Sequence, residues 1–244
     1  MNRSIAIIGM GRFGQCFAEL LKPQFDIVYL DRKQQQVPYQ RVNLCDLHRF
    51  QHVILCVPIN TLETVLKSIA PQLSAGTTVI DTASVKVLPT QWMLNALPSH
   101  IECIATHPLF GPDSYPDNTN IVMHAARCQP SAFNDWQTCL QQLGLHPIVM
   151  TPEQHDQEVS VTQSITHYVG RLLDSLALPK TEVATQGYRR LQQLQQQTCE
   201  DSLELFADLI RFNPYSADVI NVIEQRHQQL QQQLEQQESH HGQQ

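Results

Sequence analysis

The sequence predicts an α/β architecture in which a doubly wound, mainly parallel sheet is followed by an all-α region. Up to about residue 150, short apolar runs alternate with stretches whose apolar residues recur at helical spacing. This alternation is typical of parallel strands joined by crossover helices. Beyond residue 151 the strand pattern stops, while helical spacing continues to about residue 236. We therefore expect a Rossmann-type domain over 1–150, a helical domain over 151–236 and a flexible tail over 237–244.

The expected strands share a short apolar run bounded by turn residues or by the start of a helix. They are predicted at 5–8, 25–30, 53–57, 77–81, 101–105, 120–124 and 146–150. The helices between them end near a proline or a glycine. They are predicted at 60–70, 86–97 and 130–143. The interval 31–52 is rich in glutamine, arginine and asparagine, so a shortened connection is expected there instead of a full crossover helix.

The carboxyl-terminal part is expected to consist of helices separated by breaks at Pro179 and at 213–215. The helices are predicted at 152–177, 181–199, 201–211 and 215–236. Their glutamine-rich stretches still keep a stripe of leucine, isoleucine and valine at helical spacing. Because such helices cannot bury their apolar sides alone, a homodimer through this domain is expected.

Composition excludes several classes of protein. The net charge of −7 and the lack of lysine or arginine blocks disfavour a nucleic-acid partner. The sequence contains no apolar run near the roughly 18 residues of a membrane helix, and no export signal is visible, so a cytoplasmic protein is expected. The seven cysteines are scattered and never form a C-x-x-C pair, which argues against disulfides and against a metal site. An anionic small-molecule substrate would need local positive charge.

A glycine pattern near the start of the chain predicts a dinucleotide site. Gly9, Gly11 and Gly14 follow an apolar strand and open a helix. The first glycine permits a tight turn, the second lets the backbone approach a pyrophosphate, and the third lets helix pack on strand. The helix amino terminus then receives the negative charge.

The end of the second strand favours NAD as the cofactor. Asp31 lies where a carboxylate accepts hydrogen bonds from a ribose diol, and it would repel the 2′-phosphate of NADP. Neighbouring Arg32 and Lys33 keep NADP open as the less favoured alternative. The residues expected at the cofactor are Gly9, Gly11, Arg12, Phe13, Gly14, Asp31, Arg32, Val57 and Pro58.

Two further loops at the same sheet edge are predicted to carry the chemistry. His107 follows the strand at 101–105 and precedes Pro108, which restricts its backbone. Imidazole titrates near neutral pH, so His107 is a candidate base for taking a hydroxyl proton as hydride leaves. Ser84 is expected to orient the ring or to cap the next helix, and Lys86 to meet a substrate carboxylate.

Several motifs in order along the chain resemble the prephenate dehydrogenase family, especially the dehydrogenase part of bacterial chorismate mutase–prephenate dehydrogenase fusions. They are GMGRFG (9–14), VPIN (57–60), DTASVK (81–86), THPLFGPDS (106–114), EQHDQ (153–157), QSITHY (163–168) and the stretch 187–210. The resemblance implies NAD-linked oxidative decarboxylation of prephenate to 4-hydroxyphenylpyruvate, a step toward tyrosine. Because no mutase-like segment precedes the glycine loop, a stand-alone dehydrogenase is expected.

The resemblance also implies roles for single residues. It makes His107 the catalytic histidine, with Ser84 and Lys86 as nearby polar groups. In the second domain His167, Arg189 and His155 match family positions and are expected to bind substrate; for His155 the alternative is a hydrogen-bonded pair with Asp156 at the entry of a helix. One departure stands at Gln197, where the family carries an arginine that holds a substrate carboxylate. A glutamine brings no charge, so Arg171, Arg189 or Arg190 would have to supply it.

Three alternatives remain open at this point. Arogenate dehydrogenase, or another cyclohexadienyl dehydrogenase, shares the ring chemistry and is not separated from prephenate dehydrogenase by the sequence. Another hydroxyacid dehydrogenase would need a different base, and 151–177 contains no lysine to provide one. A nucleotide-binding regulatory protein without turnover would keep the glycine loop, and the substitution at Gln197 favours it.

Overall fold

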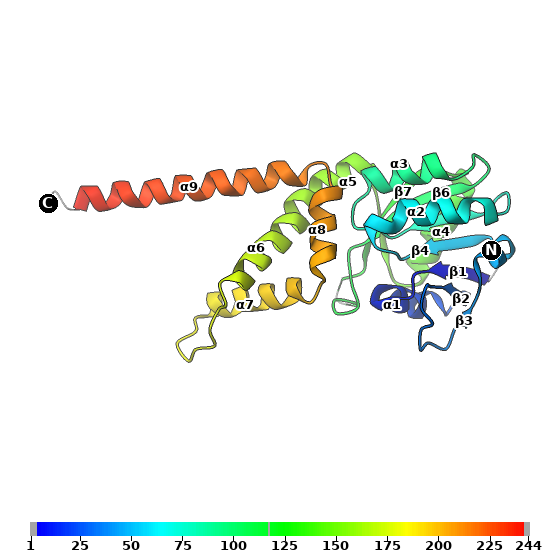
Figure 1. The fold of residues 1–244 in the computed structure, drawn as a ribbon, viewed down its shortest axis with the longest axis horizontal. Helices are drawn as coiled ribbons and strands as arrows, with labels where there is room; N and C mark the ends of the chain where they lie inside the picture. The colour runs from blue at the N-terminus through cyan, green and yellow to red at the C-terminus, as the bar shows by residue number, and fades with distance from the viewer. Residues whose placement is uncertain (1–3, 117, 242–244) are drawn as a thin grey trace. The chain divides into compact units, whose positions relative to one another are not determined.

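The computed structural model describes residues 4–116 and 118–241, with side chains up to residue 237. The chain divides into two compact units, Met1–His155 and Asp156–Gln244 (Figure 1). The first unit is a sheet covered by helices and the second is helical. The division lies five residues after the predicted end of the first domain at residue 150.

The first unit is built on an eight-stranded sheet with the order β3-β2-β1-β4-β5-β6-β7-β8. Its strands are β1 (Ser4–Ile8), β2 (Asp26–Leu30), β3 (Gln40–Arg41), β4 (His52–Leu55), β5 (Thr78–Asp81), β6 (Glu102–Pro108), β7 (Asn120–Arg127) and β8 (His146–Val149). Six neighbouring pairs are parallel, while β6 and β7 are antiparallel. The mainly parallel sheet predicted from the sequence is therefore confirmed.

Helices cover both faces of the sheet. Successive side chains of a strand point to opposite faces, so the apolar side chains on both faces need cover. The helices of this unit are α1 (Arg12–Leu21), α2 (Ile59–Ile69), α3 (Val87–Ala96) and α4 (Pro130–Gln142). Ile5 and Ile7 belong to one buried cluster with Phe17 of α1 and Trp136 of α4. Figure 1 shows α2 and α3 on the side of the strands opposite α1. The sheet is therefore doubly wound.

The connection over 31–52 is shortened, as predicted. It contains the two-residue β3 and a 3-10 helix over Leu44–Arg49. A reciprocal capping box between Asn43 and Asp46 begins that short helix. Strand β3 pairs with β2 and places Arg41 beside Tyr29.

The second unit contains the helical segments predicted from the sequence, with different boundaries. They are α5 (Pro152–Val159), which begins in the first unit, a π-helical turn (Ser160–Ser164), α6 (Ile165–Ser175), α7 (Gln186–Cys199), α8 (Leu203–Phe212) and α9 (Ser216–His241). The helix predicted at 152–177 is interrupted by the π turn. Helix α7 begins later than predicted because the Thr185 side chain caps it, accepting from the Tyr188 amide at 3.2 Å.

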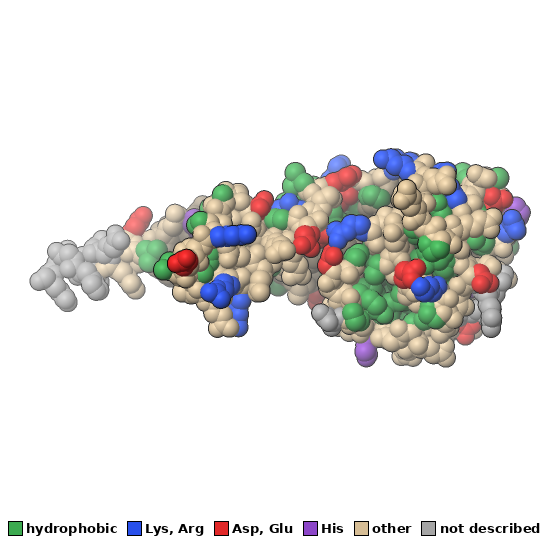
Figure 2. All heavy atoms as spheres, turned by 90° about the horizontal axis from the view of Figure 1, so that it is seen from below, with side chains coloured by type: hydrophobic (Ala, Val, Ile, Leu, Met, Phe, Trp, Pro, Cys, Tyr) green, Lys and Arg blue, Asp and Glu red, His purple; other side chains and the backbone are tan. Residues whose placement is uncertain are grey.

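Helix α9 continues five residues beyond its predicted end, so part of the predicted flexible tail is helical. Residues 242–244 of that tail lie outside the described residues. Among the helices described, α9 included, none is long and apolar enough to cross a membrane. On the face drawn in Figure 2, cationic side chains of the described residues are scattered among acidic ones.

Candidate functional site

The glycine loop has the geometry that a bound pyrophosphate needs. Gly9 has φ +93°, and a Cβ there would lie 2.2 Å from the Cys56 carbonyl oxygen. A Cβ on Gly14 would lie 2.1 Å from the Gly9 carbonyl oxygen. At Gly11, by contrast, a Cβ would meet no described atom within 4 Å. Two glycines therefore make the turn possible, and the third leaves its outer side open.

The amino terminus of α1 carries no side-chain cap among the described residues. Its first amides are therefore available to an anion, since unsatisfied amides and the helix dipole favour negative charge there. The β4–α2 loop lies against this turn, because Val57 Cγ1 is 3.1 Å from the Cβ position of Gly9. Pro58 precedes the first residue of α2 and is exposed. Val57 and Pro58 thus lie at the carboxyl edge of the sheet, as predicted.

Asp31 lies beside the glycine turn. Its carboxylate accepts from the Met10 amide at 2.8 Å and from the Lys33 amide at 3.0 Å. These bonds fix the carboxylate at the end of β2 while leaving it half-buried. Arg41 was not predicted at this site from the sequence, and its guanidinium donates to the carbonyl oxygens of Asp31 and Arg32 at 2.7 and 3.3 Å. The sequence pattern that could have placed Arg41 beside Asp31 was weak, because β3 has only two residues.

Two residues predicted at the cofactor make other contacts. The exposed Arg12 side chain forms an ion pair with Asp113 at 2.7 Å. Phe13 stacks on Phe17 with ring centroids 5.5 Å apart, and its ring lies 6.4 Å from that of Phe110. The structure therefore shows Phe13 in a packing role and joins Arg12 to the loop that follows β6.

His107 lies within β6 rather than in a loop after it, which corrects the prediction. The strand is longer than predicted because His107 pairs with Val122 of the antiparallel β7. The pairing of β5 with β6 ends at Asp81 and Ala105, so His107 still lies beyond the end of β5, at the carboxyl edge. Its side chain is only 4% exposed.

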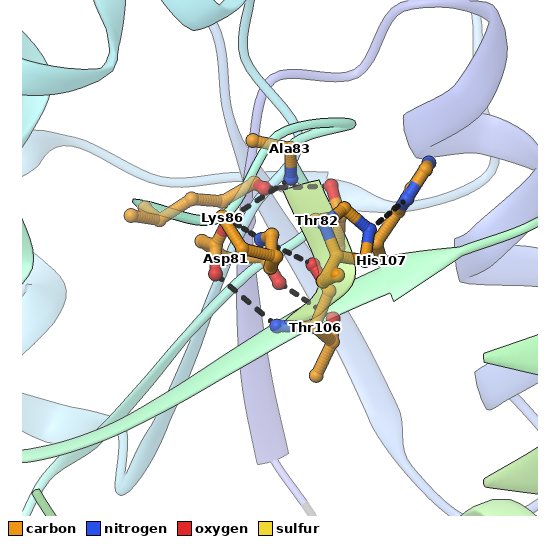
Figure 3. Close-up of polar contacts among 8 residues, drawn as sticks. Asp81, Thr82, Ala83, Lys86, Thr106 and His107 are labelled. Atoms are coloured by element: carbon orange, nitrogen blue, oxygen red, sulfur yellow. Dashed lines mark hydrogen bonds and ion pairs between the residues drawn. The ribbon is translucent and has the colours of Figure 1, made fainter. Parts of the chain in front are cut away.

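The partner of the His107 ring is a second buried histidine. Nδ1 of His107 lies 2.8 Å from Nε2 of His155, and the two rings meet edge to face at 74°. Figure 3 shows the His107 ring with this dashed contact. Burial lowers the pKa of His107 well below its ordinary value, and the neighbouring His155 and Lys86 lower it further. The His107 imidazole is therefore neutral at neutral pH.

Lys86 lies in the interior of the first unit, whereas the prediction placed it against a substrate carboxylate. Its side chain is fully buried and forms an ion pair with Asp81, and its ammonium also donates to the Thr106 carbonyl oxygen. Asp81 also accepts from the amides of Ala83 and Thr106, at 3.0 and 3.2 Å (Figure 3). The network fixes the backbone directly before His107. Asp81 was missed in the sequence, although a carboxylate ending a buried strand five residues before a lysine signals such a pair.

Ser84 lies on the loop after β5 and is half-buried. The residue that caps α3 is Lys86, without a side-chain cap bond, so the capping role predicted for Ser84 is wrong. Its hydrogen bond to the His107 ring stays a prediction. The Nδ1 side of that ring is held by His155, which the resemblance had grouped with substrate-binding positions.

The candidates of the helical unit fall into two groups. His167 is buried, with Nε2 3.9 Å from a carboxylate oxygen of Asp201. Burial lowers the pKa of His167, Asp201 opposes that shift, and Arg171 adds to it. Arg189 and Gln197 are exposed on α7. Asp201 was not among the site residues predicted from the sequence.

A glycine turn opening a helix at the carboxyl edge of a parallel sheet, with a carboxylate ending the next strand, defines a dinucleotide-binding protein of the Rossmann class. Residues 27–122 match the family described as "Prephenate dehydrogenase, nucleotide-binding domain". Over these residues the chain carries the nucleotide-binding domain of the prephenate dehydrogenase family. Residues 172–244 match a second family, described as "TYRAAT1-like, C-terminal domain".

Curated relatives extend the similarity over nearly the whole chain. Arogenate dehydrogenase 1, chloroplastic, of Arabidopsis thaliana is 30% identical over 94% of this chain and 39% of its own length. Arogenate dehydrogenase 2, chloroplastic, of the same plant is 26% identical over 94% of this chain and 69% of its own length. The chain thus spans well under half of the first relative.

A solved structure shows the same fold. Prephenate dehydrogenase from Aquifex aeolicus, in complex with hydroxyphenyl propionate and NAD+, superposes with a TM-score of 0.77. The match covers 96% of this chain and 91% of that chain at 18% identity. The likeness confirms the predicted combination of a Rossmann-type sheet and a helical region.

Proposed function

We propose that this protein is a cyclohexadienyl dehydrogenase, which oxidises and decarboxylates its substrate with a nicotinamide dinucleotide. The single observation that carries this proposal is His107. It is a buried, neutral imidazole at the same sheet edge as the glycine turn and Asp31. The family match over residues 27–122 and the curated relatives support the same chemistry.

The histidine pair sets the tautomer of the base. If Nε2 of His107 takes the substrate hydroxyl proton, Nδ1 must carry a hydrogen and donate it to Nε2 of His155. His155 is then neutral with its own hydrogen on Nδ1. Taking the proton makes His107 an imidazolium, and the His155 nitrogen stabilises it by accepting the Nδ1 hydrogen.

The cofactor, when bound, supplies the hydride acceptor. The glycine loop and the uncapped start of α1 would hold its pyrophosphate, and Asp31 would hold its ribose. After oxidation, the ring ketone is conjugated through the ring, and the ring carboxylate leaves as carbon dioxide. Aromatisation drives this loss, so the protein needs only to position the ring and to accept one proton at His107.

Of the two candidate substrates we favour arogenate over prephenate. The Asp201 carboxylate is 41% exposed and lies next to His167. A carboxylate there attracts the ammonium of arogenate and offers nothing to the keto group of prephenate. The two Arabidopsis relatives are named arogenate dehydrogenases, which supports the same choice. An Asp201→Asn variant should therefore lose more activity with arogenate than with prephenate.

We favour NAD as the cofactor because the Asp31 carboxylate lies at the ribose position and would repel a 2′-phosphate. The Arg41 guanidinium donates to two backbone carbonyls, which occupies part of its hydrogen-bonding capacity. Lower KM values with NAD than with NADP would agree with this choice.

A homodimer through the helical unit remains our proposal for the assembly. Large apolar side chains of α6, of its C-cap residue and of α9 are exposed in the single chain, and they are Leu172, Leu176, Val222, Leu230 and Leu234. Light scattering that gives the mass of one chain at micromolar concentration would contradict this proposal. The cytoplasmic location likewise stays a prediction.

The test of the function is an assay of both substrates with both cofactors. Reduced cofactor should form from at least one of them, and His107→Asn should lower kcat by at least about a hundredfold. Cofactor binding without any turnover would instead favour a nucleotide-binding regulatory protein. Unchanged turnover in His107→Asn would show that the base lies elsewhere.

A further inference from the structure

The short strand β3 places an arginine against the backbone that carries Asp31. Arg41 pairs with Tyr29 in the parallel ladder of β2 and β3. One nitrogen of its guanidinium, Nη2, donates to the carbonyl oxygens of Asp31 and Arg32 at 2.7 and 3.3 Å. A hydrogen bond from a charged donor is about twice as strong as one between neutral groups. The contact therefore restrains the two peptide units that follow β2.

The restraint acts on a connection without regular structure of its own. Residues 31–39, all of them described, contain no helix or strand. The Tyr29 hydroxyl accepts from the Gln35 amide at 3.2 Å, and the Val42 amide donates to the Tyr29 carbonyl oxygen at 2.8 Å. Segments that lack a hydrogen-bonded ladder keep conformational freedom unless other contacts remove it. The position of Asp31 therefore depends on the contacts of its own groups.

The carboxylate and the carbonyl group of Asp31 are held by different donors. Oδ2 accepts from the Met10 amide of the glycine turn at 2.8 Å, and Oδ1 accepts from the Lys33 amide at 3.0 Å. A carboxylate has about four lone-pair sites, so each oxygen can still accept one hydroxyl group. Arg41 holds the carbonyl oxygen instead. It thus restrains Asp31 without using either carboxylate oxygen.

An arginine at this edge is also a candidate to bind the 2′-phosphate of NADP. Arg32 and Lys33 are exposed directly after Asp31, and Arg41 is exposed as well. The guanidinium of Arg41 differs in having two backbone acceptors. The two roles have opposite consequences, because a phosphate-binding arginine favours NADP, whereas a well-placed Asp31 carboxylate repels its 2′-phosphate.

We propose that Arg41 is a positioning residue for the cofactor. It holds the Asp31 carboxylate where that group accepts from the adenosine ribose diol and repels a 2′-phosphate. The proposal rests on the part of the proposed function that assigns a nicotinamide dinucleotide to the glycine turn. A residue of β3, ten positions after the carboxylate, is then part of what selects NAD over NADP. Because Arg41 acts through Asp31, its effect disappears when the carboxylate is removed.

Two pairs of nucleotides separate this effect from a general attraction between an arginine and phosphate. ADP and 2′-deoxy-ADP differ by one hydroxyl group, and NADP and NAD differ by one phosphate. Calorimetric titration would measure the Kd of all four for the full chain and for Arg41→Met. The matched control is Arg49→Met, which replaces an exposed arginine at the end of the 3-10 helix in the same connection.

The ratio of the Kd of 2′-deoxy-ADP to that of ADP reports the bond between Asp31 and the ribose. It should be at least about three in the unchanged chain, because a hydrogen bond to a charged group is lost with the hydroxyl. Arg41→Met should bring the ratio close to one, and Arg49→Met should leave it unchanged. A general loss of positive charge weakens both nucleotides equally and does not alter the ratio. Arg41→Lys keeps a charged donor and should recover part of it.

The second pair gives a sign. In Arg41→Met the Kd of NADP should fall relative to that of NAD, by about threefold or more, because a displaced carboxylate repels the 2′-phosphate less. An arginine that binds the phosphate gives a rise instead, and a rise would overturn the proposal. So would an unchanged nucleotide ratio in Arg41→Met, an equal change in Arg49→Met, or an unchanged chain that does not distinguish ADP from 2′-deoxy-ADP.

Removing the carboxylate tests the route of the effect. In Asp31→Ala the ratio for ADP and 2′-deoxy-ADP should already be close to one, and adding Arg41→Met should not change it. A ratio that stays high in Asp31→Ala and falls in the double variant would show that Arg41 contacts the hydroxyl itself, against the proposal. Should Arg41→Met fail to fold in a thermal scan, Arg41→Gln is also uncharged, has a shorter side chain and carries the same predictions.

The proposed function is tested separately, since these titrations need no turnover. A chain that oxidises neither arogenate nor prephenate, yet loses the nucleotide ratio in Arg41→Met, would keep the role of Arg41 and remove the activity. A chain with normal turnover in which Arg41→Met keeps the ratio would retain the activity and remove the role of Arg41.

Discussion

Nδ1 of His107 lies 2.8 Å from Nε2 of His155, and both side chains are buried in the same unit. The two residues are 48 positions apart in the chain. One imidazole must donate and the other must accept, so the tautomer of each depends on the other. This dependence makes His155 a positioning residue for the proposed base.

Replacing His155 tests this role. His155→Leu removes the acceptor for the Nδ1 hydrogen of His107, so we expect kcat to fall about tenfold or more, with KM and the Kd of NAD nearly unchanged. His155→Asn retains an acceptor oxygen and should recover part of the loss. Steady-state kinetics with arogenate or prephenate would measure both. Equal kcat values for Leu and Asn would show that hydrogen bonding at this position does not matter.

The buried pair of Lys86 and Asp81 should matter for stability. Lys86→Met leaves the Asp81 carboxylate buried without its cation, which should lower the free energy of unfolding by about 3–5 kcal/mol. The double variant Asp81→Asn, Lys86→Met removes both charges and should recover part of that loss. Urea unfolding would measure both. The matched control is Lys67→Met, whose exposed pair with Glu63 should contribute less than about 1 kcal/mol.

His52 should make the first unit sensitive to acid. It is buried against Phe25 and Trp136, and its ring nitrogens have no partner among the described residues. Burial is the main cause that lowers the pKa of His52 from 6.5 to about 4. As pH falls from 6.5 to about 4, the unfolded chain binds a proton at His52 that the folded chain does not. Stability should therefore decrease across this window, by about 3 kcal/mol.

His52→Phe should remove this contribution, because phenylalanine fits an aromatic cluster and does not titrate. Unfolding at several pH values between about 4 and 7 would show a shallower dependence than in the unchanged chain. The exposed His100 gives a control, since His100→Phe should leave the slope as it was. An unaltered slope in His52→Phe would mean that other groups cause the acid sensitivity.

Gly170 permits the close packing of α6 on α7. A Cβ at this position would lie 1.9 Å from Thr198 Oγ1. Gly170→Ala should therefore separate the two helices and destabilise the helical unit by about 1–3 kcal/mol. The double variant Gly170→Ala, Thr198→Gly should recover part of the lost stability. Gly187→Ala on α7 is the control, since its Cβ would meet only Thr185 Oγ1 at 3.9 Å. Thermal unfolding of the four chains would measure the effects, and equal melting temperatures for the two alanine variants would refute this packing role.

Local patterns in the sequence predicted the elements of the fold. Apolar runs such as 5–8 and 77–81 predicted strands within one or two residues of those observed. The positions of prolines and glycines predicted where helices end. These features depend on neighbours a few residues apart, and the chain itself specifies them. The π turn was not predicted, because no local rule separates it from the α-helix on either side.

The partners of the site residues depended on the tertiary structure. The sequence by itself determined that a glycine turn, a carboxylate after the second strand and a histidine after the fifth predicted strand belong to one edge of a sheet. Only the folded chain decided that Lys86 pairs with Asp81, that His155 holds His107 and that the Arg171 guanidinium donates to the backbone oxygen of Asp201. The physical reason is the separation along the chain of the residues that interact. Strand and turn preferences arise between adjacent residues, whereas burial and hydrogen-bond partners arise when packing brings distant residues together.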